Sequence, residues 1–267
     1  MKNLITFLCL GFILTACQNN HKQDVKTEES ETKKEQLSNP NTNVNFNSCF
    51  ETDKIINHDY YSLSYNEEAE QAEWVSYKLT TSSFSQNIER TNDFREDPMV
   101  IEGSANLGDY YKSGYDRGHL APAGSMKKSE LSMSESFMMS NMSPQLAGFN
   151  RGVWKRLEGK VRFWVENNDS ILVVTGPILD NPLTTIGENE VFVPRAFFKV
   201  LVAYKNEKVM GIGFIVPHEK SDKSLYSFAT SIDSIEDLTG IDFYCRLDEL
   251  TQSIVEKNSS VKNFIYR

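Results

Sequence analysis

Two segments of the chain carry residue types that could together hydrolyse a phosphate ester. The first is Asp116-Arg117-Gly118-His119, and the second runs from Asn150 to Glu158. A histidine can act as a base near neutral pH, an amide oxygen and a carboxylate are ligands or water contacts for Mg²⁺, and arginines bind phosphate. This pattern predicts a metal-dependent phosphodiesterase.

Each residue of the first segment has a functional and a structural interpretation. His119 is the candidate general base that takes a proton from water, and the alternative is a hydrogen-bonded histidine at a strand end. We expect Arg117 to contact a phosphate oxygen, unless it forms a surface salt bridge with Asp116 or Glu130. Gly118 lets the backbone bend close to a substrate, and Asp116 is expected to hold the loop by hydrogen bonds.

Both segments belong to an ordered set of motifs that resembles the DNA/RNA non-specific endonuclease family, in its endonuclease G-like branch of ββα-metal (His-Me finger) nucleases. The resemblance runs from about Tyr60 to the last predicted helix. Its pieces are residues 74–79, 93–98, 115–122, 140–145, 150–158 and 235–244. It implies a magnesium-dependent endonuclease, with Mn²⁺ able to substitute, that cleaves both DNA and RNA to 5′-phosphate products.

The resemblance also implies roles for single residues of the second segment. Asn150 matches the family's direct protein ligand to magnesium, although an asparagine at a helix start is often an N-cap. Glu158 lies about 12 Å further along an ideal helix, at roughly 1.5 Å per residue. We therefore expect it to reach the metal through water, and the alternative is a surface pair with Arg162 or Lys155.

Further arginines match phosphate-binding positions of the family. Arg162 is one of them, and the other lies upstream, where the match is loose. Arg90 precedes Phe94 by four residues and Arg95 follows it directly, and Arg90 is the preferred candidate. Two polar residues are expected to support the metal finger, Asn141 and Gln145.

Other chemistries find little support in the sequence. It contains no Cys-x-x-Cys pair, no His-Glu-x-x-His, no Gly-x-Ser-x-Gly and no phosphate-binding glycine loop followed by lysine. The alternative from another class is a lipid-anchored binding or adhesion module on a catalytically inactive nuclease-like fold. The joint presence of His119, Asn150 and Glu158 favours the enzyme.

The charge of the chain is distributed unevenly. A net charge of −9 is unusual for a protein that coats nucleic acid. Between residues 111 and 162, however, nine basic residues face four acidic ones, a local charge of +5. A positive stripe on an acidic body suits an enzyme that grips a nucleic-acid backbone locally and then releases it.

The N-terminus predicts export and a lipid anchor. A basic start precedes an apolar run from Leu4 to Ala16, which is shorter than the roughly 20 residues that span a bilayer. The run ends in Leu14-Thr15-Ala16-Cys17, which resembles the lipobox of bacterial lipoproteins. We expect a signal peptide at residues 1–16, a lipidated Cys17 with a disordered tether to residue 47, and a nuclease domain at residues 48–267 in the bacterial cell envelope. The alternative is an ordinary signal peptide that contains a cysteine.

Cysteine usage follows from this processing. Cys9 leaves with the signal peptide and Cys17 carries lipid, so Cys49 and Cys245 remain. In an oxidising compartment two thiols indicate one disulfide, and the alternative is two unpaired buried cysteines.

Hydrophobic periodicity indicates the elements that must position the site. Strands are expected at residues 60–65, 74–80, 170–176, 192–204 and 208–217. Turn-forming residues at 205–207 predict that the last two strands form an antiparallel hairpin.

From Asn150 onward the period changes to that of a helix. One apolar stripe comprises Val153, Trp154, Leu157, Val161, Trp164 and Val165. A second helix at about residues 234–238 should be capped by Ser234 or Asp233 and closed by Gly240, and a last helix should cover about residues 247–257. The class is α+β with a mixed, mainly antiparallel central sheet. The resemblance adds a ββα-metal finger active site, built from a short hairpin and the helix from Asn150.

Overall fold

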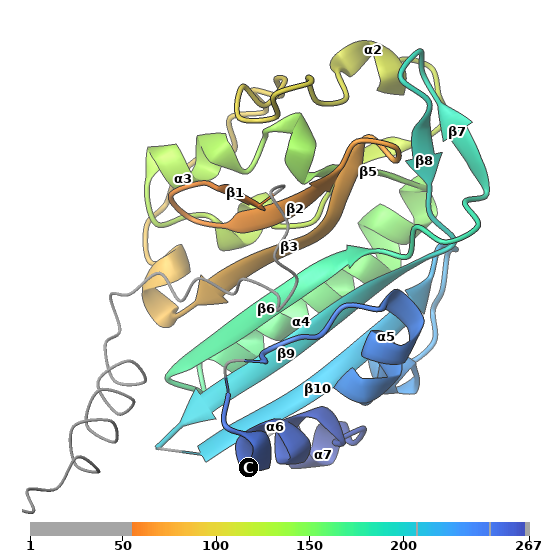
Figure 1. Ribbon diagram of the computed structural model, residues 1–267. Coiled ribbons are helices and arrows are strands. Elements are labelled where there is room, and N and C mark those ends of the chain that lie inside the picture. The colour runs from red at the N-terminus through yellow and green to blue at the C-terminus, as the bar shows by residue number, and fades with distance from the viewer. Residues whose placement is uncertain (1–54, 207, 246, 265–267) are drawn as a thin grey trace, which may run out of the picture. The chain divides into compact units, whose positions relative to one another are not determined.

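The computed structural model describes residues 55–206, 208–245 and 247–264 (Figure 1). The predicted signal peptide, the lipidation site Cys17, the tether and Cys49 lie outside the described residues. The central element is a seven-stranded sheet in the order β1-β2-β3-β6-β9-β10-β11, in which each neighbouring pair is antiparallel. The predicted α+β class with a mainly antiparallel sheet is therefore confirmed.

The strands of this sheet have the following bounds: β1 Ile55–Asn57, β2 Ser62–Asn66, β3 Gln71–Leu79, β6 Ser170–Pro177, β9 Ala196–Lys205, β10 Lys208–Pro217 and β11 Ala229–Thr230. The predicted hairpin of the last two long strands is confirmed, because Lys205 pairs with Lys208 across the turn. Asn206 in that turn has a φ of 46°, a left-handed conformation that asparagine tolerates better than most residues.

The prediction of one strand over residues 192–204 is wrong. This segment is two strands, β8 (Val191–Val193), which pairs with β7 (Thr184–Ile186), and β9 of the main sheet. Pro194 separates them because it has no backbone N–H for a sheet ladder.

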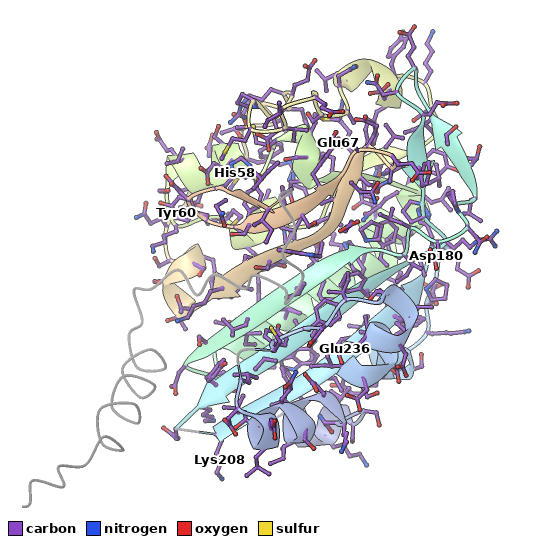
Figure 2. All side chains as sticks on the ribbon, in the orientation of Figure 1. His58, Tyr60, Glu67, Asp180, Lys208 and Glu236 are labelled. Carbon is purple, nitrogen blue, oxygen red and sulfur yellow. The ribbon has the colours of Figure 1, made fainter. Side chains whose placement is uncertain are left out.

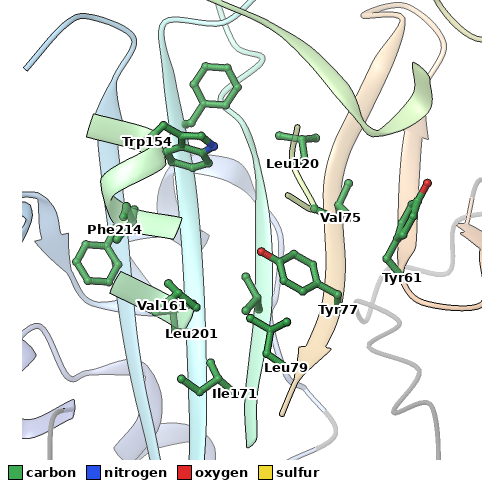
Figure 3. Packing of buried hydrophobic residues seen from close by; sticks show 14 of the residues in the cluster. Tyr61, Val75, Tyr77, Leu79, Leu120, Trp154, Val161, Ile171, Leu201 and Phe214 are labelled. Atoms are coloured by element: carbon green, nitrogen blue, oxygen red, sulfur yellow. The ribbon is translucent and has the colours of Figure 1, made fainter. Parts of the chain in front are cut away.

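Helices cover both faces of the sheet, and each face has its own hydrophobic core. On one face lies α4 (Lys155–Val165), where Trp154 and Val161 pack with Leu201 of β9 (Figure 3). On the opposite face α5 (Ile232–Thr239) and α6 (Glu249–Glu256) pack through a second cluster that contains Ile232 and Val255. The predicted apolar stripe thus turns α4 toward the sheet.

Two helix boundaries differ from the prediction or refine it. The N-cap of α5 is Ser231, whose hydroxyl accepts the N–H of Ser234, so capping by Ser234 or Asp233 is wrong. The true cap lies two residues before Asp233 and three before Ser234, because Ile232 is itself helical and buried. Gly240 closes the helix as predicted, with a φ of 69°.

The remaining helices and strands are short: α2 Leu107–Tyr110, β4 Asp116–His119, α3 Glu130–Glu135, β5 Met142–Gln145 and α7 Val261–Phe264. Among the described residues, no helix is both long enough and apolar enough to span a bilayer. Cys245 is disulfide-bonded, and its partner lies outside the described residues. Cys49 as that partner stays a prediction.

Candidate active site

A hairpin followed by a helix brings the two chemistry-bearing segments together. In the hairpin, β4 pairs with β5 so that His119 lies opposite Met142. Asp116 at the start of β4 then reaches the helix, where it accepts hydrogen bonds from Asn150 Nδ2 at 3.0 Å and from Arg151 Nη2 at 2.6 Å. Asp116 therefore holds the loop, and the two strands and the helix form a ββα finger.

The start of this helix is not the regular helix that the sequence predicts. Residues 149–154 form a π-helical segment, η4, with non-helical backbone angles at Gly152, and regular α-helix begins only at Lys155. Single π turns inside helices often occur at functional sites. The wider turn is fixed from outside, because His218 Nε2 accepts the N–H of Leu146 at 2.7 Å and the Phe149 ring stacks in the core.

The side chain of Asn150 is oriented for a ligand. Gly148 is the N-cap of the segment, so the N-cap interpretation of Asn150 does not apply. Since Nδ2 is engaged by Asp116, the oxygen Oδ1 remains, and no hydrogen bond from the described residues reaches it. Amide oxygen is a ligand type that Mg²⁺ accepts in proteins.

His119 is buried and keeps one ring nitrogen free. Its ring lies edge-on to Phe137, with ring centroids 4.9 Å apart, and also contacts Phe94. The ring bonds the backbone of Arg117, and Nε2 is buried with no partner among the described residues. Burial, with the positive charge of Arg90, lowers the pKa of His119 to about 3, so the imidazole is neutral at physiological pH. The ring is therefore unprotonated at Nε2, as a general base must be before it takes a proton, and it is a weaker base than free imidazole.

Two of the predicted arginines are held by aromatic rings near His119. The guanidinium of Arg117 lies 4.3 Å from the ring centre of Phe94, and that of Arg90 lies 4.6 Å from the ring centre of Phe137. Arg117 forms no ion pair with Asp116 or Glu130 within the described residues, because Asp116 is taken by Arg151. Stacking leaves the edges of both guanidinium groups available for an anion.

The two upstream arginines have different contacts. Arg95 Nη1 donates to the Asp93 carboxylate at 2.9 Å and to the Ser134 carbonyl at 3.1 Å, so its donors serve the fold. Arg90 instead stacks on the ring that contacts His119, and its charge acts on both His119 and Glu158. The structure favours Arg90 as the arginine that faces the site.

Glu158 lies half-buried on α4 among four cationic side chains. Burial raises its pKa, and the positive charges of Lys199, Arg162, Arg90 and Lys155 act against that rise. No ion pair to Glu158 forms in the described parts of the chain, so the predicted surface pair with Arg162 or Lys155 is absent. Arg162 instead approaches Ser125 Oγ at 3.4 Å.

Lys199 is a residue of the site region that the sequence reasoning missed. Alternation along β9 places it on the face under α4, where it is fully buried. Its Nζ donates to Thr175 Oγ1 of the neighbouring strand at 3.0 Å and lies 4.5 Å from the ring centre of Trp154, one turn before Glu158. Burial lowers the pKa of Lys199, and Glu158 opposes that shift. The available signal was a single lysine inside an apolar run, residues 197–202.

The two predicted supports of the finger act differently. Asn141 is fully buried, and its amide bonds the backbone N–H of Ala121 at 2.8 Å and the Ser136 carbonyl at 2.8 Å. Gln145 makes no side-chain hydrogen bond within the described residues and fills space instead. A Cβ on Gly118 would lie 2.1 Å from its Cδ, so the position before His119 requires glycine.

The other described histidines serve the fold. His58, which is labelled in Figure 2, has its Nε2 2.8 Å from Asp97 Oδ2. His218 bridges the Pro194 carbonyl and the Leu146 N–H. His21 lies outside the described residues. His119 is therefore the histidine of the described chain that lies in the ββα finger.

Comparison with known protein families identifies the family of this chain. The model of the DNA/RNA non-specific endonuclease family matches residues 38–250. The chain belongs to this family. It is therefore a nucleic-acid hydrolase, and the endonuclease G-like members of the family depend on divalent metal ions.

Several relatives are about one-third identical to the chain. A nuclease of Syncephalastrum racemosum is 34% identical over 218 residues, which cover 73% of this chain and 68% of the relative. Nuclease C1 of Cunninghamella echinulata var. echinulata is 33% identical, over 74% of this chain and 85% of its own. A chain in the crystal structure of the EndoG/EndoGI complex is 31% identical, with a TM-score of 0.69 over 74% of this chain and 88% of that chain. The fold and the family thus agree.

Proposed function

We propose that this protein is a sugar-non-specific, magnesium-dependent endonuclease that hydrolyses phosphodiester bonds of DNA and RNA to 5′-phosphate products. The observation that carries the proposal is the bond between Asp116 and Asn150 Nδ2. It places in one finger the Asn150 Oδ1 and the His119 Nε2, and neither atom accepts a hydrogen bond from the described residues.

The donor set fits a hard divalent cation. Asn150 Oδ1 would be the direct ligand, and the carboxylate of Glu158 would hold water molecules of the coordination shell. When bound, such an ion supplies positive charge that stabilises the leaving 3′ oxygen, a role that Mg²⁺ fills and that Mn²⁺ can share. The cations around Glu158 favour its ionised form, which is the form that accepts hydrogen bonds from water.

The protein groups divide the reaction between them. His119 Nε2 takes a proton from the water that attacks phosphorus, and the bond to the Arg117 backbone keeps the ring in place. Arg117 and Arg90 neutralise the phosphate while their stacked rings hold them. Arg162, on the same helix as Glu158, contacts the scissile phosphate or the adjacent phosphate of the backbone. The bond between phosphorus and the 3′ oxygen breaks, which leaves the phosphate on the 5′ end.

A plasmid cleavage assay tests this function. The protein should nick and linearise plasmid and degrade RNA with Mg²⁺ or Mn²⁺, and excess EDTA should stop both reactions. The new ends should accept label from polynucleotide kinase only after phosphatase treatment, because they carry a 5′ phosphate. Full activity in EDTA contradicts the proposal. Binding without cleavage supports the alternative, an inactive binding or adhesion module.

We also propose a lipid anchor in the bacterial cell envelope, with Cys17 as the first residue of the mature chain. The support is the sequence Leu14-Thr15-Ala16-Cys17 after a short apolar run. Intact mass should show a lipidated Cys17, and Cys17→Ser should leave the chain unprocessed or soluble. Cleavage elsewhere with no added lipid contradicts the anchor.

A further inference from the structure

Two helices on the face of the sheet opposite α4 are packed unusually close to strand β10. The strand carries glycine at two points of contact. A Cβ on Gly211 would lie 2.4 Å from Val255 Cγ1 of α6, and a Cβ on Gly213 would lie 2.6 Å from Ile235 Cδ1 of α5. These glycines let both helices approach the strand backbone, which sets α5 and α6 beside each other.

This packing brings three carboxyl groups together. One oxygen from each of Asp233, Glu236 and Glu256 lies within 4.8 Å of the others. Glu236 is labelled on α5 in Figure 2. Oxygen ligands of Ca²⁺ lie about 2.3–2.6 Å from the ion, so two ligands of one ion are at most about 5 Å apart. The spacing of the three oxygens fits a single ion.

The carboxyl of Glu256 is buried with only partial compensation, from the side chain of Gln252 and the charge of Lys257. Glu256 is only 8% exposed, and its Oε1 has no hydrogen-bond partner in the described parts of the chain. A buried carboxylate is costly unless it is paired or coordinates a metal. Lys257 adds positive charge near Glu256, but its Nζ donates to Ser253 Oγ at 3.1 Å and forms no ion pair with Glu256 within the described residues.

The other groups around the cluster add negative charge or polar support. Asp242 contributes a fourth carboxylate to the electrostatic surroundings of Glu236 and Glu256. Glu236 Oε1 accepts the Phe243 N–H at 2.7 Å, which leaves its other oxygen for a ligand. Four carboxyl groups therefore lie near one another, and a bound cation would offset their mutual repulsion.

We propose that Asp233, Glu236 and Glu256 form a calcium site that ties α6 to α5. Calcium suits the site because it accepts six to eight oxygen ligands in flexible geometry, including water, whereas Mg²⁺ requires a tight octahedron. Asp233 and Glu236 are half-exposed, so water can complete the shell. The site lies across the sheet from the ββα finger and does not depend on the proposed nuclease mechanism.

Thermal unfolding in an Asn150→Ala background tests the site, because that change removes the candidate metal ligand of the finger. Protein freed of metal with EDTA and then dialysed should gain about 5–10 °C in Tm when Ca²⁺ exceeds its Kd by about a hundredfold. Calorimetric titration should give one ion per chain. The absence of a Ca²⁺-dependent rise in Tm overturns the proposal.

Two substitutions assign the effect to the cluster. Adding Glu256→Gln should abolish the rise, whereas Glu249→Gln, at an exposed glutamate of the same helix, should preserve it. If Glu256→Gln shows no cooperative unfolding, Asp233→Asn replaces it and should weaken Ca²⁺ binding at least tenfold. An undiminished rise in Tm in the folded cluster variant shows that Ca²⁺ binds elsewhere and overturns the proposal.

Discussion

Replacing Gly118 with alanine perturbs the position directly before His119 in a way that the structure makes quantitative. The added Cβ would lie 2.1 Å from Gln145 Cδ, 2.3 Å from its Oε1 and 2.5 Å from its Cγ. Non-bonded carbon atoms rest about 3.5–4.0 Å apart, so the hairpin or the side chain must move by about 1 Å or more. Gln145 has no exposed surface into which it could swing.

This displacement has an expected size in both stability and activity. Overpacking of a filled core typically costs about 1–3 kcal/mol, which corresponds to about 2–12 °C in Tm for a domain of this size. A misplacement of about 1 Å at a reacting group can cost about a hundredfold in rate. We therefore expect Gly118→Ala to fold, with a lower Tm and about a hundredfold lower kcat in the plasmid assay.

A second change separates crowding from any other effect of alanine at position 118. Gln145→Ala removes all three crowded atoms, and Gln145 has no side-chain hydrogen bond to lose within the described residues. The double variant Gly118→Ala/Gln145→Ala should recover kcat to within about tenfold of Gln145→Ala alone, a clear departure from additivity. Wild-type activity in Gly118→Ala refutes this explanation. A double variant that is no more active than Gly118→Ala also refutes it.

Three further changes test other parts of the site. His119→Ala should lower kcat by about two or more orders of magnitude, as loss of a general base does. Filter binding should show an unchanged affinity for duplex DNA. Turnover near the wild-type value would show that His119 is not the general base. In that background, Arg162→Ala should make the slope of log affinity against log salt shallower by about 0.9, and an unchanged slope contradicts a phosphate contact. Lys199→Met should move the acidic limb of the pH–kcat profile to higher pH, because Lys199 lowers the pKa of Glu158 and its loss lets that pKa rise. An unmoved limb in folded Lys199→Met contradicts the coupling.

The sequence by itself determined which residues could do chemistry and the family to which they belong. Six motifs in one order, among them residues 116–119 and 150–158, indicated the family, although none of them is a strong signal alone. Strands such as β10 and the C-cap Gly240 were also predictable, since alternation and left-handed backbone depend on near neighbours in the chain. The lipid anchor and Cys49 stay predictions from sequence.

Local errors arose where a single residue overrides a periodic pattern. Pro194 divides a segment whose apolar residues look like one strand. The helix start at Asn150 became a π turn, because contacts from Phe149 and His218 outweigh the helical preference of the segment. Helical periodicity alone does not distinguish an α turn from a π turn.

Tertiary structure alone decided which distant residues share the site. Asp116 bonds Asn150 across 34 positions of the chain, and Lys199 reaches the helix of Glu158 from the middle of the sheet. The sequence preferred Arg90 over Arg95 from its place before Phe94, and only the tertiary contacts distinguish how the two guanidinium groups are held. Such pairings depend on how strands and helices pack, and residues far apart in a chain carry no local signal of their distance in space. The sequence therefore specified the chemical groups, and packing determined which of them are neighbours.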